Sequence, residues 1–190
     1  MDTITSLTLL AKLRDTQDDG AWRRFDQRYR PMILAFARKM CVRDADAHDI
    51  AQEVIAAFIS AYRDGTYDHD KGSLRGWLFR VTHHRIIDAR RAGNGPPPRD
   101  GGWPNLESRD TAEQIWEAQW REFVIQACIK EVRRHVELHT FEAFRLYVLE
   151  EVPAEDVAAR LGIERSAVYV AKSRVLHRMR KLLRTMEEIW

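Results

Sequence analysis

The sequence predicts an all-α protein, and three observations lead to this fold class. Apolar residues recur at helical spacing along most of the chain, and no run alternates as a β-strand would. Charged residues make up 32% of the 190 residues, which suits amphipathic helices with a solvated face. A segment rich in proline and glycine, 93–113, has the composition of a flexible linker. We therefore expect two small helical domains, 1–92 and 114–190, on either side of it.

The composition limits the class of protein. The formal net charge is only +2, so any anionic partner must be inferred from local charge rather than from the whole chain. Cys41 and Cys128 are far apart in apolar helical contexts, a pattern typical of a reducing compartment rather than of a disulfide framework. No leader pattern is present and no apolar run reaches about 18 residues. We expect a cytoplasmic protein without membrane insertion.

The first domain is expected to hold helices over 4–17, 21–41, 43–64 and 73–91. The second of these carries a broad aromatic stripe for the core, and Pro31 inside it should bend the helix. Gly65 ends the third helix, and Ser73 caps the fourth.

Helix 43–64 has an acidic outer face that begins with Asp44 and Asp46 and continues through Asp49 and Glu53. Acidic side chains in a first turn favour the helix dipole, so part of this face requires no function. Taken alone, the face is either a solvated surface or a protein interface.

Helix 73–91 combines five arginines with one acidic residue, Asp88. Phe79, His83 and His84 are interleaved with these cations. Cations that follow a phosphate backbone and rings that stack on bases are typical of single-stranded nucleic-acid binding. The alternative is that Trp77 and Phe79 belong to the core and the arginines are solvated.

Two helices within 114–151 are expected to support a helix-turn-helix over 153–184, with Pro153 in a first turn, Gly162 at the turn and Ser166 as N-cap. In such a motif the second helix enters the DNA major groove with its N-terminal residues on base edges. The base-reading candidates are Arg165, Ser166, Tyr169 and Lys172, with Ser173 on an outer face and Arg174, His177 and Arg178 suited to phosphates. The alternative is a solvated basic helix.

Catalytic and metal sites are not expected. The loop 66–72 lacks the glutamate that a calcium loop requires, since Phe79 stands at its twelfth position. His135 and His139 have the spacing of zinc ligands, but Val136 replaces the glutamate of the HExxH motif. No nucleophile–base pair or phosphate-binding glycine loop is present, so we expect no enzyme and no cofactor.

Together these segments resemble the extracytoplasmic-function (ECF) sigma factors of bacterial RNA polymerase. The resemblance covers roughly 20–92 and 114–186. DIAQEVIAAF (49–58) resembles the family's segment for the clamp helices of the largest polymerase subunit, and 67–91 resembles its loop and helix for melting and reading the −10 element. The helix-turn-helix resembles its −35 reader.

The resemblance implies a sigma region 2 domain, a sigma region 4 domain and the following sites. The polymerase contacts would be Asp49, Gln52 and Glu53. The −10 contacts would be Asp68, His69, Lys71, Arg75, Trp77, Arg80, His83, His84 and Arg85. Implied partners are core polymerase (clamp helices and flap), promoter DNA and an anti-sigma factor or a regulatory kinase. The alternative is a stand-alone helix-turn-helix regulator, which leaves 43–92 unexplained and would bind a palindrome as a dimer.

Overall fold

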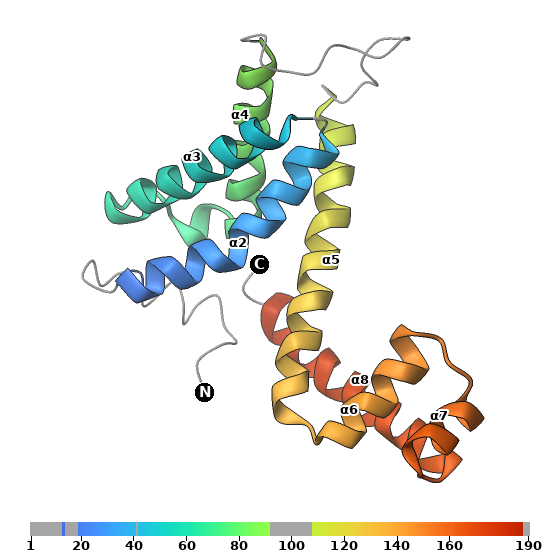
Figure 1. Ribbon diagram of the computed structural model, residues 1–190. Helices are drawn as coiled ribbons and strands as arrows, with labels where there is room; N and C mark the ends of the chain where they lie inside the picture. Colours follow the sequence, from blue (N-terminus) through green and yellow to red (C-terminus); the bar gives the residue numbers. More distant parts are fainter. Residues whose placement is uncertain (1–12, 14–18, 41, 92–107, 188–190) are drawn as a thin grey trace, which may run out of the picture. The chain divides into compact units, whose positions relative to one another are not determined.

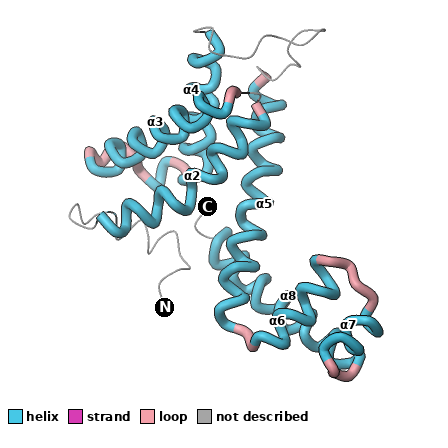
Figure 2. The backbone as a smooth tube through the Cα atoms, in the orientation of Figure 1, coloured by secondary structure: helices cyan, strands magenta, loops and turns pink. Residues whose placement is uncertain are grey.

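The computed structural model describes residue 13 and residues 19–40, 42–91 and 108–187. These residues form helices and turns without a strand, which confirms the expected all-α class (Figures 1 and 2). The helices are α2 (Asp19–Lys39), α3 (Asp44–Arg63), α4 (Leu74–Arg91), α5 (Arg109–His135), α6 (Leu138–Phe144), α7 (Ala154–Leu161) and α8 (Arg165–Glu187), with a 3-10 turn η1 (His69–Lys71) and a π-helical turn η2 (Arg145–Leu149). The helix expected at 4–17 lies outside the described residues. None of the described helices is long and apolar enough to cross a membrane.

Local signals place several helix ends where the sequence predicts them. The Ser73 hydroxyl accepts a hydrogen bond from the Gly76 amide at 3.1 Å and so caps the start of α4. Gly65 lies two residues after Arg63, the last residue of α3, and has a φ of 69°, a conformation in which glycine has no steric penalty. Helix α2 continues through Pro31, which is exposed.

Described residues up to Phe123 form one compact unit, whose core is built from large aromatic side chains. Phe25 of α2 and Phe58 of α3 stack with ring centroids 4.5 Å apart. Phe36 of α2 meets Phe79 of α4 edge to face at 6.1 Å. Rings in these offset and edge-on arrangements add attraction to the burial of their area, and they fix α2, α3 and α4 against one another.

The first half of α5 belongs to this same unit. Trp116 is 1% exposed and lies 5.0 Å from the Phe36 ring and 5.7 Å from the Phe79 ring. Trp120 stacks on Tyr29 at 6.4 Å. The expectation that both tryptophans support the helix-turn-helix is therefore wrong. Helical spacing shows that a stripe is buried, but not which helices cover it.

Helix α5 begins at Arg109, five residues before the expected start at 114, and it is continuous to His135. The division between the two compact units falls inside this helix, after Phe123. The linker and domain boundary expected at 93–113 stay a prediction, since 92–107 lie outside the described residues.

The second compact unit contains the helix-turn-helix, and one buried cluster there is built from small and medium-sized side chains. That cluster consists of Ala143, Leu146, Ala154, Val157, Val168 and Ala171. Gly162 joins α7 to α8 in the left-handed conformation (φ 64°, ψ 36°), as expected. The alanine side chains of this cluster allow α7 and α8 to approach each other closely.

Two details of the motif differ from expectation. Helix α8 begins at Arg165, so Ser166 lies inside its first turn and is not the N-cap. Pro153 stands at the N-cap of α7 with a ψ of 142°, one position before the helix. Both shifts are one or two residues, which is the usual uncertainty of a helix end read from sequence.

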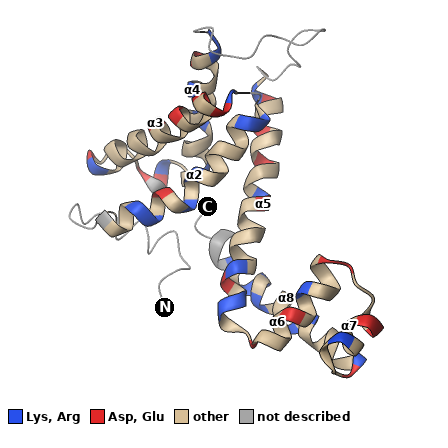
Figure 3. Ribbon diagram, in the orientation of Figure 1, with Lys and Arg blue, Asp and Glu red and all other residues tan. Residues whose placement is uncertain are grey.

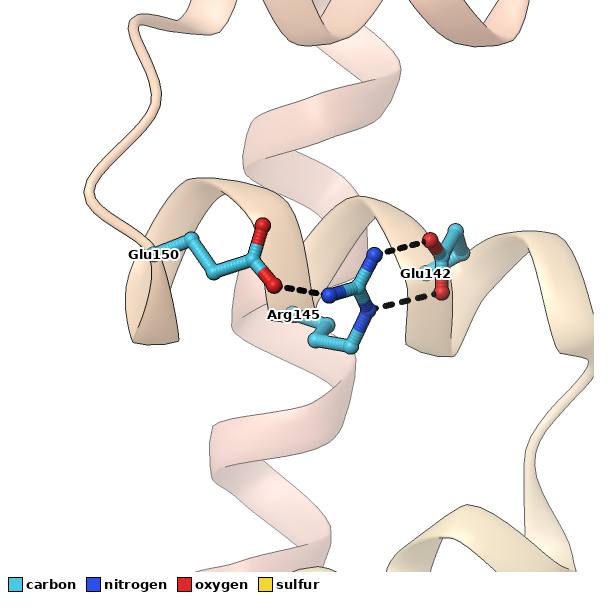
Figure 4. Close-up of polar contacts among 3 residues, drawn as sticks. All are labelled: Glu142, Arg145 and Glu150. Carbon is cyan, nitrogen blue, oxygen red and sulfur yellow. Dashed lines mark hydrogen bonds and ion pairs between the residues drawn. The ribbon is translucent and has the colours of Figure 1, made fainter.

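A charged network fixes the segment that leads into the helix-turn-helix (Figure 4). The Arg145 guanidinium donates a 3.0 Å hydrogen bond to Glu142 and also pairs with Glu150, which follows η2. The hydrogen bond to Glu142 raises the pKa of Arg145, and the same bond lowers the pKa of the Glu142 carboxyl. Arg145 thus ties α6 to the turn that precedes α7.

Candidate polymerase and nucleic-acid interface

The acidic face of α3 is divided into paired and unpaired carboxylates. Asp44 pairs with Arg38 and Asp46 with Arg43, each at 2.7 Å. Asp49 is exposed and forms no ion pair with another described residue. The acidic residues of α3 gather toward the start of the helix in Figure 3. The unpaired charge is therefore concentrated at Asp49, where a partner could neutralise it.

The other two expected polymerase contacts lie next on the same surface. Gln52 and Glu53 are exposed. A Glu53 carboxylate oxygen lies 3.3 Å from Nε of Arg85, an expected −10 contact on α4. Both partners are about half exposed, and such pairs contribute little to stability. Glu53 can therefore exchange Arg85 for another partner at small cost.

In the loop before α4, Asp68 and Lys71 lie close together. Asp68 accepts a 2.9 Å hydrogen bond from the Asp70 amide and lies 3.2 Å from the Lys71 ammonium. Nothing is described of the His69 side chain. The contacts of Asp68 hold this turn together, and the Lys71 ammonium stays exposed to solvent.

Trp77 was expected either to belong to the core or to contact nucleic acid, and its position is compatible with both. Its ring meets Phe58 edge to face at 5.2 Å, and Tyr67 lies 6.5 Å away. It is nevertheless only half-buried. Burial is the first cause that raises the pKa of Tyr67 to about 12. Trp77 is part of the core and also offers a ring surface beside the loop.

Arg75 faces α5. Its guanidinium pairs with Glu117 and lies 5.9 Å from the Trp120 ring. Burial is the main cause that lowers the pKa of Arg75. Arg75 would have to leave Glu117 before it could contact DNA.

The other expected −10 residues of α4 converge. Arg80, His83 and His84 line a hollow of about 500 Å³, together with Phe79, Ile87, Asp88, Arg91 and Arg109. We call this site the α4 hollow. The ring of His83 stacks on Phe79 at 5.6 Å, and Nδ1 of His84 lies 2.9 Å from Asp88.

Sequence reasoning missed Arg91 and Arg109 in this hollow. Arg91 is eleven positions after Arg80, so both share one face of a helix of 3.6 residues per turn, and this signal could have found Arg91. Arg109 begins the next helix in the chain, beyond the undescribed segment. No local pattern connects it to α4.

The first turns of α8 gather three of the expected base-reading residues. Arg165 donates a 3.2 Å hydrogen bond to the Tyr169 hydroxyl and pairs with Glu155 of α7 at 2.9 Å. Lys172 lies 5.3 Å from the ring of Tyr147, which the sequence analysis missed. Ser166 is exposed on the same helix. These polar groups stand at the surface, as groove contacts require.

The expected phosphate contacts lie further along α8. Ser173, Arg174, His177 and Arg178 line a second hollow of about 660 Å³ against His135, Val136, Glu137 and Thr140. His135 itself contacts the Glu131 carbonyl oxygen at 3.0 Å. The arrangement places two arginines beside the α5–α6 turn, on a surface suited to a phosphate backbone.

The described residues form an all-α fold with exposed cations on α4 and α8. A family model described as Sigma-70 region 2 matches residues 25–95, a segment that includes α3 and α4 and most of α2. The ECF RNA polymerase sigma factor RpoE of Cereibacter sphaeroides is 26% identical over 113 residues, which are 60% of this chain and 61% of that protein. The ECF RNA polymerase sigma factor SigD of Mycobacterium tuberculosis is 28% identical over 177 residues, 86% of this chain and 77% of that protein.

A solved structure described as CnrH in complex with the cytosolic domain of CnrY is also similar, with a TM-score of 0.39 and 19% identity over 93% of this chain and 95% of that one. Residues 25–95 thus match the Sigma-70 region 2 model, and the chain is similar to proteins named ECF RNA polymerase sigma factors. It spans about three fifths of the length of the Cereibacter sphaeroides relative.

Proposed function

We propose that this chain binds core RNA polymerase and directs it to promoters through separate contacts with the −10 and −35 elements. One observation carries the proposal: the region 2 match at 25–95 includes α3, α4 and the loop between them, where all the expected polymerase and −10 residues lie. The likeness to SigD over 86% of this chain supports a sigma factor's role for the helix-turn-helix unit as well.

The polymerase contact consists of Asp49, Gln52 and Glu53. They occupy one exposed surface of α3, and Asp49 lacks an ion pair among the described residues. A basic surface on the clamp helices would neutralise this charge. Opposite charges at an interface chiefly raise the association rate and fix the orientation of the partners.

The −10 element is opened by the loop before α4 and by α4 itself. Unstacking a base costs a few kcal/mol, which stacking on rings and contacts with cations must offset. Trp77 and the α4 hollow offer such rings and cations. The −35 element is held as duplex by α8, with Arg165, Ser166, Tyr169 and Lys172 on bases and Arg174, His177 and Arg178 on phosphates.

The chain acts in the cytoplasm, where polymerase and promoter DNA are found, and it does no covalent chemistry itself. Contact with the polymerase flap accompanies −35 binding. An anti-sigma factor or a regulatory kinase outside this chain controls its release.

Co-elution with core polymerase on a sizing column tests the proposal. The wild-type chain should elute with core, and Asp49→Lys should weaken this binding at least tenfold. Asp64→Lys is the matched control, because it makes the same charge change at an exposed position at the other end of α3. Equal binding by both variants would exclude the acidic face as the contact, and no binding by wild type would exclude the proposed function.

A further inference from the structure

We propose that Tyr147 is a positioning residue for −35 recognition, because its ring holds Tyr169 and Lys172 of α8 in the conformation that contacts bases. The inference rests on the proposed function and deepens it. Tyr147 belongs to the π-helical turn η2, not to α7 or α8, the two helices of the helix-turn-helix. The base preference of the motif therefore depends in part on a residue outside the helix that enters the groove.

The Tyr147 ring contacts two of the expected base-reading residues. It meets the Tyr169 ring edge to face, with ring centroids 5.6 Å apart and an angle of 87° between the ring planes. The Lys172 ammonium lies 5.3 Å from the centroid of the Tyr147 ring, within the range of cation–π attraction. Both contacts join η2 to α8, so one ring from outside the helix limits the positions of two readers.

A third reader is connected to Tyr147 through Tyr169. The Arg165 guanidinium donates a 3.2 Å hydrogen bond to the Tyr169 hydroxyl and pairs with Glu155 of α7 at 2.9 Å. Arg165 and Tyr169 are 60% and 41% exposed, whereas Tyr147 is half-buried. The readers are thus displayed to solvent, and Tyr147 supports them from the side of the core.

The backbone of η2 fixes the position of Tyr147. The Glu150 amide donates a 3.0 Å hydrogen bond to the Arg145 carbonyl, five residues back, as in a π-helical turn. The Arg145 guanidinium pairs with Glu142 before the turn and with Glu150 after it (Figure 4). Glu151 follows with a φ of 55°, which is uncommon for a residue other than glycine. Such turns and such backbone angles concentrate at functional sites, and here they flank Tyr147.

The packing of η2 explains why the ring affects base preference rather than general affinity. Leu146 is buried in the core cluster of this unit, and Tyr147 packs against the same cluster. A lysine or an exposed tyrosine loses rotamer freedom when it binds, and contacts already present in the free chain reduce that loss. Base contacts carry sequence information and phosphate contacts do not. Loss of the Tyr147 ring should therefore reduce discrimination between sequences.

A comparison of duplex affinities tests the proposal. Holoenzyme assembled from the full wild-type chain first enriches a preferred sequence from a pool of short randomised duplexes. Anisotropy then gives the affinity ratio of that duplex to a scrambled one. The variant is Tyr147→Leu, which removes the ring but keeps an apolar side chain against the core cluster. Tyr147→Phe restores the ring, and Leu149→Ala is the matched control at a 46% exposed position of the same turn.

We expect Tyr147→Leu to lower the affinity ratio about five- to tenfold, because an aromatic pair and a cation–π contact are lost together. Tyr147→Phe and Leu149→Ala should keep the wild-type ratio. None of the three variants should change the slope of log K against log salt, since none removes a charge that contacts phosphate.

A second measurement separates positioning from a merely structural role. If Tyr147 acts through Tyr169 and Lys172, Tyr147→Leu should have no further effect in a chain that carries Tyr169→Ala and Lys172→Ala. An unchanged ratio for Tyr147→Leu, a loss of ratio that persists in that background, or equal weakening of both duplexes would overturn the inference. These results leave the proposed function intact, whereas failure of the wild-type holoenzyme to enrich any sequence would contradict both proposals.

Discussion

The two compact units differ in the side chains that pack their helices together. In the unit of α2–α4 and the first half of α5, large rings such as Phe25, Phe58 and Trp116 fill the core. In the helix-turn-helix unit, the core cluster around α7 and α8 is built from alanine, valine and leucine. The second cluster lets α7 and α8 approach each other closely.

The expected functional residues differ in the same way. Arg75 of the first unit is 30% exposed and lies between Glu117 and the Trp120 ring. Arg165 of the second unit is 60% exposed, and its pair with Glu155 is a surface contact. Arg165 is thus already exposed at the surface, whereas Arg75 must give up its contacts with Glu117 and Trp120 before it engages DNA.

The largest effect should come from the aromatic core of the first unit. Trp116→Ala removes a ring that is 1% exposed and should destabilise this unit by about 3–5 kcal/mol. Urea unfolding followed by circular dichroism measures the loss. Trp116→Phe is the control, since it keeps a ring and removes an indole N–H that has no hydrogen-bond partner among the described residues. A loss below about 1 kcal/mol for Trp116→Ala would mean that α5 does not belong to this core.

A smaller effect is expected at the turn of the helix-turn-helix. Gly162→Ala forces a Cβ into a positive φ and should cost about 1–2 kcal/mol, although no atom lies within 4 Å of the new carbon. Gly72→Ala adds a methyl group in equally open space without a positive φ, and should cost little. The difference between the melting temperatures of the two variants measures the cost of placing a Cβ at a positive φ. Equal melting temperatures would contradict the left-handed turn.

The expected division of labour along α8 can be measured next. Arg165→Ala should reduce the preference for a cognate −35 duplex over a scrambled one, because it removes a base contact. Arg178→Ala should weaken both duplexes alike and lower the salt slope by about 0.9, as the loss of one phosphate contact does. Anisotropy with holoenzyme across a salt series separates these outcomes. Identical behaviour of the two variants would remove the distinction.

The smallest effect is a pH dependence of the first unit. Burial lowers the pKa of His83 below its ordinary value of 6.5, so the unfolded chain binds this proton more readily than the folded chain. Stability from this group is full above 6.5 and falls as the pH drops through the folded pKa. His83→Gln should flatten this slope in urea unfolding between pH 5 and 7, whereas His84→Gln, at an exposed position, should keep it. A slope that survives His83→Gln would assign the pH dependence to another group.

Features determined by neighbours in sequence could be predicted, such as the Ser73 cap, the Gly65 end and the Gly162 turn. Features determined by distant partners could not. A helix that includes Trp116 and Trp120 was expected within 114–151, but the sequence did not show that these two rings pack on α2 and α4. For the same reason the sequence did not show that Glu117 holds Arg75 or that Arg109 lines the α4 hollow.

Run-off transcription with core polymerase and the purified full chain tests the central claim most directly. The templates are a pool of promoter fragments from the genome that encodes the chain. We predict discrete transcripts that require the chain and that core polymerase alone does not make. The Asp49→Lys variant should abolish these transcripts, and the Asp64→Lys variant should preserve them. The absence of any chain-dependent transcript would contradict the account.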